Sequence, residues 1–172
     1  MNQPAPQEEI AHALSALMNL PLWAANRAAD MEMFQFGERR VWKDTKAIDR
    51  EVGEYALHIQ CPWRIVNSHG IVVGSQDIHY PLDESADWDQ ADGTRRDRRI
   101  AAWLGEHSSA QPRVERIETD SVGGFKLFME HNVVLEVFPA HSLRGEYSEH
   151  WRLFRPSEEG RHFAVTGHGV ER

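Results

Sequence analysis

Histidine, aspartate and arginine are the residue types through which this chain could do chemistry. It has ten histidines, and imidazole serves both as a metal ligand and as a proton carrier near neutral pH. Two local groups stand out, Asp77 with His79, and the C-terminal trio of His150, His162 and His168. Each could transfer protons. A solvated strand end and an exposed polar sheet face explain the two groups more simply.

Sequence motifs for catalysis are absent. The chain contains no H-E-x-x-H, C-x-x-C or G-x-S-x-G pattern and no glycine-rich loop with phosphate-binding spacing. Its single cysteine, Cys61, excludes an internal disulfide and falls on the apolar side of a predicted strand, which is typical of an inert core thiol. We therefore predict no catalytic residue, no metal site and no cofactor.

A Trp-Arg pair occurs twice, as Trp63-Arg64 and as Trp151-Arg152, and each pair precedes a second apolar run. Neighbouring residues of a strand project to opposite faces, so each pair places an indole in the core and a guanidinium on the outer face. One type of hairpin used twice explains the repeat. The alternative is an internal duplication in which Arg64 and Arg152 lie on related surfaces and together bind an anion or an acidic partner.

The net charge of -8 and the pI near 5.7 disfavour nucleic acid and anionic lipid as partners, because most of the surface repels them. The basic run RRDRR at residues 95 to 99 is the one local exception. It follows an acidic stretch that contains Asp83, Glu84, Asp87, Asp89 and Asp92. We interpret the basic run as a solvated helix face whose charge this stretch neutralises.

The length of 172 residues suits a single domain, residues 1 to 172, with residues 1 to 7 as a flexible tail. No apolar run approaches the roughly 18 residues that a membrane span requires. The N-terminus lacks the features of a signal peptide. We expect a cytoplasmic protein with no membrane contact.

The clearest structural pattern lies at residues 54 to 66, where apolar side chains occupy the odd positions from Tyr55 to Ile65. His58 and Arg64 fall on the polar side. A period of two predicts one long strand with one buried face. Pro62 cannot donate a ladder hydrogen bond, so it indicates an edge strand or a bulge. The turn residues at 67 to 70 then predict a hairpin over residues 54 to 79.

Further patterns predict an α+β fold of mainly antiparallel sheet with about seven to eight strands. Helical spacing predicts helices at residues 8 to 19 and near 94 to 105, and residues 31 to 36 are strand-like. Two more hairpins are predicted at 124 to 139 and 149 to 169. In the first, Met129 should face Val133 across a three-residue loop, with Asn132 in the left-handed conformation.

The segments ALHIQCPWRIV and EHWRLFRP, together with GGFKLFMEHNVVLEVFP and LPLWAANRAADMEMFQFG, span much of the chain. In these motifs the protein resembles a family of small uncharacterised bacterial proteins that is common in actinobacteria. The resemblance implies a self-contained cytosolic domain and transfers no catalytic residue.

Three hypotheses for function follow from the sequence. The first is a non-catalytic binding protein that recognises a protein partner, with an immunity protein that neutralises a toxin as one form of it. The second is a small-molecule-binding or enzymatic domain that uses the outer sheet face, and the third is a structural homo-oligomer. The candidate binding residues are Arg64, Arg152, His58, His150, His162 and His168. A deep pocket lined by several of them would favour the second hypothesis, whereas a flat or convex aromatic face would favour the first or third.

Overall fold

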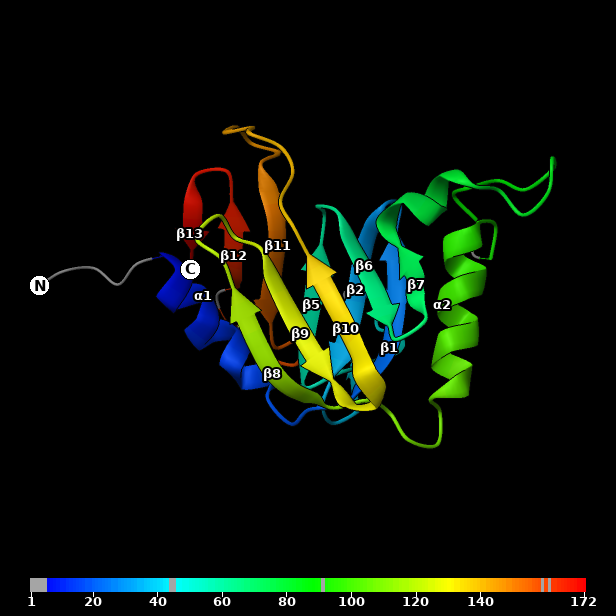
Figure 1. The fold of residues 1–172 in the computed structure, drawn as a ribbon, viewed down its shortest axis with the longest axis horizontal. Helices are drawn as coiled ribbons and strands as arrows, with labels where there is room; N and C mark the ends of the chain where they lie inside the picture. The colour runs from blue at the N-terminus through cyan, green and yellow to red at the C-terminus, as the bar shows by residue number, and fades with distance from the viewer. Residues whose placement is uncertain (1–5, 44–45, 91, 159, 161) are drawn as a thin grey trace, which may run out of the picture.

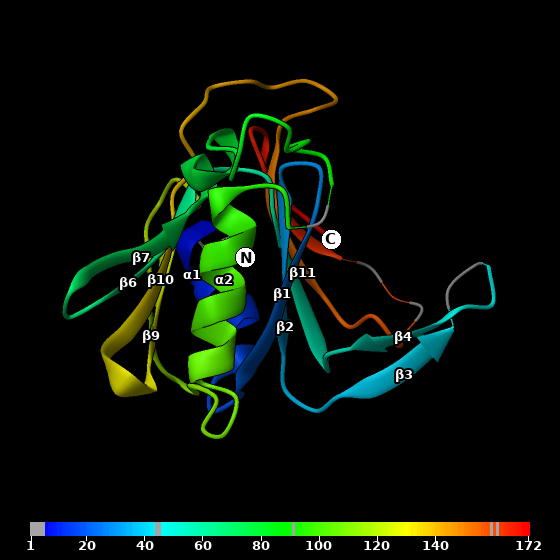
Figure 2. The same cartoon turned by 90° about the vertical axis from the view of Figure 1, so that its right-hand side faces the viewer.

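The structure is a computed structural model that describes residues 6–43, 46–90, 92–158, 160 and 162–172. Two antiparallel sheets face each other across one core (Figures 1 and 2). The six-stranded sheet contains, in spatial order, β1 (Leu22–Ala28), β2 (Met31–Phe36), β5 (Tyr55–Ile59), β11 (Glu149–Phe154), β12 (Phe163–Thr166) and β13 (Gly169–Glu171). The five-stranded sheet contains β7 (Gly70–Gly74), β6 (Trp63–Asn67), β10 (Val133–Val137), β9 (Phe125–Met129) and β8 (Val114–Thr119).

Two helices close the open sides of this sandwich. Helix α1 (Pro6–Leu14), which the 3-10 turn η1 (Ser15–Leu17) follows, packs against β8 and contacts β13. Helix α2 (Arg95–Glu106) packs against β7 and β1 at the opposite side, as Figure 2 shows. Each helix thus covers the gap between one edge strand of each sheet. The small hairpin of β3 (Arg40–Lys43) and β4 (Asp49–Val52) projects away from the sandwich.

The two tryptophans of the repeated Trp-Arg pairs fill the core from opposite sheets. Trp63 and Trp151 are 2% and 0% exposed, which confirms that both indoles are buried. Trp63 of β6 packs edge-on against Phe34 of β2, with 5.3 Å between ring centroids. Trp151 of β11 packs in the same manner against Phe125 of β9, at 5.0 Å. Each indole therefore contacts a phenylalanine of the facing sheet, and these contacts join the sheets.

The prediction of one long strand at residues 54 to 66 is wrong. The segment forms β5 in the six-stranded sheet and β6 in the five-stranded sheet, and the chain crosses between them at residues 60 to 62. Pro62 lies at this crossing, neither on an edge strand nor in a bulge, and its carbonyl accepts a hydrogen bond from the Phe138 N–H. Because the core lies between the sheets, the same side chains face inward before and after the crossing.

The two Trp-Arg segments each form an antiparallel hairpin with a register shift. In β6 and β7, Arg64 lies opposite Gly74, and in β11 and β12, Arg152 lies opposite Ala164. The predicted hairpin at residues 54 to 79 is thus reduced to β6 and β7. Its second arm ends at Gly74, where the 3-10 helix η2 (Ser75–His79) begins.

Several sequence predictions are confirmed. The strand at 31 to 36 is β2, and the helix near 94 to 105 is α2. In the β9–β10 hairpin Met129 lies opposite Val133, the loop is the 3-10 turn η3 (Glu130–Asn132), and Asn132 has a φ of 57°. The α+β class with mainly antiparallel sheet is correct, although the described residues form more strands than expected. In particular, the β3–β4 hairpin and β1 were not predicted.

Candidate functional site

Three of the six predicted binding residues meet on the outer face of the six-stranded sheet. Arg152 of β11 lies directly opposite His58 of β5 in the strand pairing. The ring of Phe154 lies 4.7 Å from the His58 ring and 4.1 Å from the His162 ring, which stacks on it. The Arg152 Nη1 approaches the His162 Nδ1 at 3.4 Å. Sequence reasoning had placed His58 on the polar side of one strand and Arg152 and His162 on the polar side of a separate hairpin, and the pairing of β5 with β11 brings them together.

The positive charge of Arg152 in this histidine–arginine cluster is paired with a neighbouring carboxylate. Arg152 donates from Nε and Nη2 to the two carboxylate oxygens of Glu149, each at 2.6 Å. Gln60 donates a further hydrogen bond to Glu149 at 2.9 Å. Burial, with the neighbouring Arg152 cation, lowers the pKa of His58 to about 4. His58 is therefore neutral near pH 7, and the guanidinium already has a bidentate partner.

The other three predicted residues lie elsewhere. Arg64 lies on the outer face of the five-stranded sheet, where its Nε pairs with Glu136 at 2.5 Å. His150 is buried, with its ring 4.4 Å from that of His141, and His168 lies in the exposed turn after β12. Since Trp63 and Trp151 point inward from facing sheets, Arg64 and Arg152 point outward in opposite directions. The hypothesis that they bind one anion together is wrong.

Hollows near the predicted residues are small. A hollow of about 260 Å³ borders Arg64, and another of about 240 Å³ borders His162. Each is lined by a single one of the six candidates. Neither hollow therefore gathers the histidines and arginines that an enzymatic site on the outer face would need.

Asp77 and His79 lie in η2 and not on a strand, so a separation of two residues does not place them on one face. Asp77 accepts a hydrogen bond from the Gly74 N–H at 3.0 Å and pairs with Arg95 at 3.2 Å. Its carboxylate therefore holds the start of η2.

Burial raises the pKa of the Cys61 thiol to about 12, so this cysteine stays protonated.

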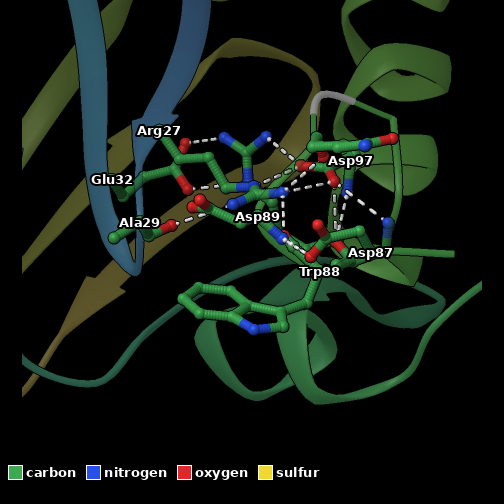
Figure 3. Close-up of polar contacts among 10 residues, drawn as sticks. Arg27, Ala29, Glu32, Asp87, Trp88, Asp89 and Asp97 are labelled. Atoms are coloured by element: carbon green, nitrogen blue, oxygen red, sulfur yellow. Dashed lines mark hydrogen bonds and ion pairs between the residues drawn. The ribbon is translucent and has the colours of Figure 1, made fainter.

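A buried ion network, which sequence reasoning missed, lies between β1, β2 and α2 (Figure 3). The Arg96 guanidinium pairs with Glu32 and reaches Asp97 at 3.2 Å. Arg27 of β1 donates to the two oxygens of Asp97 at 2.7 and 3.0 Å. We call Arg27, Glu32, Arg96 and Asp97 the four-residue network. Its side chains are at most 8% exposed, which corrects the interpretation of RRDRR as a wholly solvated face.

The pKa values of the two carboxyl groups of the network shift in opposite directions. Burial raises the pKa of Glu32 to about 7, although the hydrogen bonds and charge of Arg96 oppose this rise. Burial acts in the same direction on Asp97, but the hydrogen bonds from Arg27 and Thr94 outweigh it and lower the pKa of Asp97 to about 2. Asp97 therefore stays ionised, and its charge also holds the guanidinium of Arg27.

Arg27 fixes the acidic stretch that precedes α2. It donates to the carbonyl oxygens of Trp88 at 2.6 Å and of Gln90 at 2.9 Å, as well as to that of Ala29 at 3.0 Å. Backbone hydrogen bonds from Leu82 to Gly93, at 3.2 Å, and from Arg95 to Tyr80, at 2.8 Å, join the two ends of this stretch. We call residues 80 to 93 the acidic loop.

The acidic loop displays aromatic and aliphatic side chains among carboxylates. Trp88 is 51% exposed and Tyr80 is 61% exposed, and Leu82 is also exposed. The carboxylates are those of Asp83, Glu84, Asp87, Asp89 and Asp92. From Tyr80 to Gln90 no side chain is buried. The loop is therefore held in place through hydrogen bonds to its backbone, and its side chains from Tyr80 to Gln90 contribute little to the hydrophobic core.

Some signal for this network existed in the sequence. The period of two in β2 places Glu32 on the same inward face as Phe34 and Phe36. Thr94 and Asp97 have the spacing of a capping box, and each accepts a hydrogen bond from the other's backbone N–H. What no local pattern gives is the partner of Glu32, because Arg96 lies 64 residues away along the chain.

Comparisons with protein-family models, curated protein sequences and solved structures find no match to this chain. The resemblance to the actinobacterial family therefore stays a prediction. In the part of the chain that the structure describes, no three His, Cys, Asp or Glu side chains are placed to hold a metal ion. Within the same residues, no helix has the length and hydropathy to cross a membrane.

Proposed function

We propose that this protein is a non-catalytic binding protein whose acidic loop recognises a basic protein surface. One observation carries the proposal: Trp88 is half exposed, while its own carbonyl oxygen is held at 2.6 Å by an arginine of the buried network. Large aromatic side chains dominate the energetics of protein interfaces. An immunity-type role is the form of this proposal in which the basic partner is a toxin.

Preorganisation supports this assignment. Ordering a loop on binding costs conformational entropy, so a loop that is ordered beforehand binds more tightly with the same contacts. Arg27 makes three of its hydrogen bonds to backbone carbonyls, two of them in the acidic loop, and its charge is held by Asp97. Such a loop presents Trp88 in a defined position without burying any side chain from Tyr80 to Gln90.

Charge supports a basic partner. Asp87 and Asp89 flank Trp88, and the chain carries a net charge of -8. A negative field accelerates encounter with a positive surface and excludes acidic competitors. Desolvation of the indole would supply affinity, while the carboxylates would supply orientation and salt sensitivity.

A peptide selection tests the proposal with defined probes. A random twelve-residue peptide library is selected on the immobilised protein, and the affinities of enriched peptides are measured by calorimetry. We expect enrichment in lysine and arginine, weaker binding at higher salt, and a loss of about tenfold or more on Trp88→Ala. The expected loss reflects the removal of the central aromatic contact.

Tyr147→Ala is the matched control, because Tyr147 is an aromatic residue that is 86% exposed and follows a carboxylate, that of Glu146. It lies outside the acidic loop, so its removal should leave binding unchanged. Enriched peptides without basic residues would contradict the proposal. So would equal losses on Trp88→Ala and Tyr147→Ala, or no loss on Trp88→Ala.

A further inference from the structure

A groove of about 560 Å³ runs between β1 and α2, next to the acidic loop. Figure 2 shows α2 beside the edge of the six-stranded sheet that β1 forms. The groove is lined on the β1 side by Ala25 and Ala28, and on the helix side by Ile100, Ala101 and Leu104. Alanine side chains are present on both walls, Ile100 and Leu104 add apolar surface, and Arg27, Arg96 and Asp97 of the four-residue network also line the groove.

Strand β1 is the outermost strand of its sheet. Its start is held by a hydrogen bond from the Leu22 N–H to the Pro112 carbonyl at 3.0 Å. From Ala24 to Ala28, no described strand pairs with its outer edge. An edge strand presents backbone donors and acceptors to an added strand unless proline, bulges, outward charges or a covering helix prevent it. From Ala24 onward β1 has no proline, its register shift lies before Ala24, and its one charged residue, Arg27, is held in the network. Helix α2 lies beside this edge and leaves the groove open between them.

The charge of the groove indicates the sign of its occupant. Within the network, two arginines face two carboxyl groups, those of Glu32 and Asp97. Asp89 and Asp92 of the acidic loop also line the groove, and the Asp89 carboxylate is close enough to Arg27 to stabilise its cation electrostatically. These two carboxylates add negative charge at the end of the groove that the acidic loop forms. An extended segment with lysine or arginine complements this arrangement.

We propose that an extended cationic segment of the partner binds along β1 as an added strand, in the groove beside α2. Backbone hydrogen bonds to β1 supply affinity, and small apolar side chains fill the space between the alanines and Ile100. A lysine or arginine of the segment reaches Asp89 and Asp92. Figure 3 shows Asp89 next to Arg27 and Trp88, so one partner can contact the groove and the loop together. This inference rests on the proposed function, because it names the part of the basic partner that is recognised.

Short capped peptides test the groove by itself. The probe is an acetylated and amidated hexapeptide of alternating valine and lysine, titrated into the ¹⁵N-labelled full-length chain and followed by amide chemical shifts. We expect shifts concentrated at residues 24 to 28 of β1 and 95 to 104 of α2. A glutamate version should not bind. N-methylation of every second backbone amide should weaken binding about tenfold or more, because it removes ladder donors.

Two neighbouring alanines give a matched pair of variants. Ala101→Phe fills the groove from an exposed helix position and should weaken binding of the valine–lysine peptide about tenfold or more. Ala102→Phe places the same side chain at the next exposed position, which borders hollows on the other side of α2 and should leave binding unchanged. Both substitutions lie on the surface, so the fold should tolerate both.

Several results would overturn this inference. These are no shifts at millimolar peptide, shifts that map away from β1 and α2, and affinity that survives both N-methylation and Ala101→Phe. Its failure is distinguishable from failure of the proposed function. Library-selected basic peptides that lose affinity on Trp88→Ala but not on Ala101→Phe would retain the acidic loop as the binding surface and exclude the groove.

Discussion

Removing the guanidinium of Arg27 should both destabilise the protein and release the acidic loop. Arg27→Met keeps most of the aliphatic length but deletes the hydrogen bonds to Asp97, Ala29, Trp88 and Gln90. The side chains of Arg27 and Asp97 are 8% and 7% exposed. Asp97 is thus left in a buried position without its closest cation.

The magnitude follows from that burial. Breaking a buried ion pair by removing one partner typically costs about 3 to 5 kcal/mol. Asp97 keeps its contacts with Arg96, at 3.2 Å, and with Thr94, at 2.9 Å. We therefore expect the lower limit, a loss of about 3 kcal/mol in the free energy of unfolding. The loop carbonyls lie near solvent and can bind water in place of Arg27. Losing the hydrogen bonds from Arg27 to these carbonyls should therefore affect mainly the order of the loop.

Urea unfolding monitored by circular dichroism measures the loss of stability, and limited proteolysis with a protease specific for acidic residues measures access to the loop. Arg116→Met is the matched control. Arg116 is exposed, pairs with Glu118 and lies 3.5 Å above the centre of the Phe128 ring. An exposed pair of this kind contributes less than about 1 kcal/mol. The reasoning is refuted if Arg27→Met costs no more than this control and leaves the rate of loop cleavage unchanged.

The remaining predictions concern the core and the outer sheet face. Trp151→Ala should lower the free energy of unfolding by about 3 to 5 kcal/mol, because the indole is fully buried and donates to the Gly123 carbonyl at 2.7 Å. The exposed control Trp88→Ala should cost under about 1 kcal/mol in the same urea experiment, and similar losses for both would contradict the core assignment. The pKa of His58 is lowered from 6.5 to about 4, so the unfolded chain takes up this proton first as pH falls through that interval. The free energy of unfolding should therefore decrease as the pH is lowered from 6.5 to about 4, by at most about 3 kcal/mol before solvent screening. The His58→Gln variant should show a weaker pH dependence of urea unfolding over the same interval.

The local elements that the sequence predicted best are those defined by contacts between neighbouring residues. The β9–β10 hairpin requires a three-residue loop for Met129 to face Val133, and the structure has this register. Helix α2 combines an apolar stripe at Ile100, Trp103 and Leu104 with the Thr94 cap. Both features depend on side chains within a few residues of one another, so their physical cause is visible in the sequence.

The binding residues were predicted less well, because a polar strand face does not reveal its neighbours. His58 and Arg152 share one sheet face only because β5 and β11 are adjacent, although these two residues lie more than ninety positions apart in the chain. Arg64 belongs to an identical dipeptide and yet lies on the facing sheet. The acidic loop was recognised as polar, but its attachment to Arg27 depends on a contact with a distant strand.

The sequence by itself determined which side of the segment at residues 54 to 66 faces the core. Alternation from Tyr55 to Ile65 requires one buried face, and both tryptophans of the repeated pairs are buried as that alternation demands. Only the tertiary structure decided that the chain changes sheets at Pro62, because a strand that crosses between two facing sheets keeps the same side toward their common core. The alternation of apolar and polar residues shows which side of a strand faces the core, but it does not show to which sheet the strand belongs. The pairing of Glu32 with Arg96 was likewise decided by the approach of α2 to β2, since a buried charge requires a partner but does not specify where in the chain that partner lies.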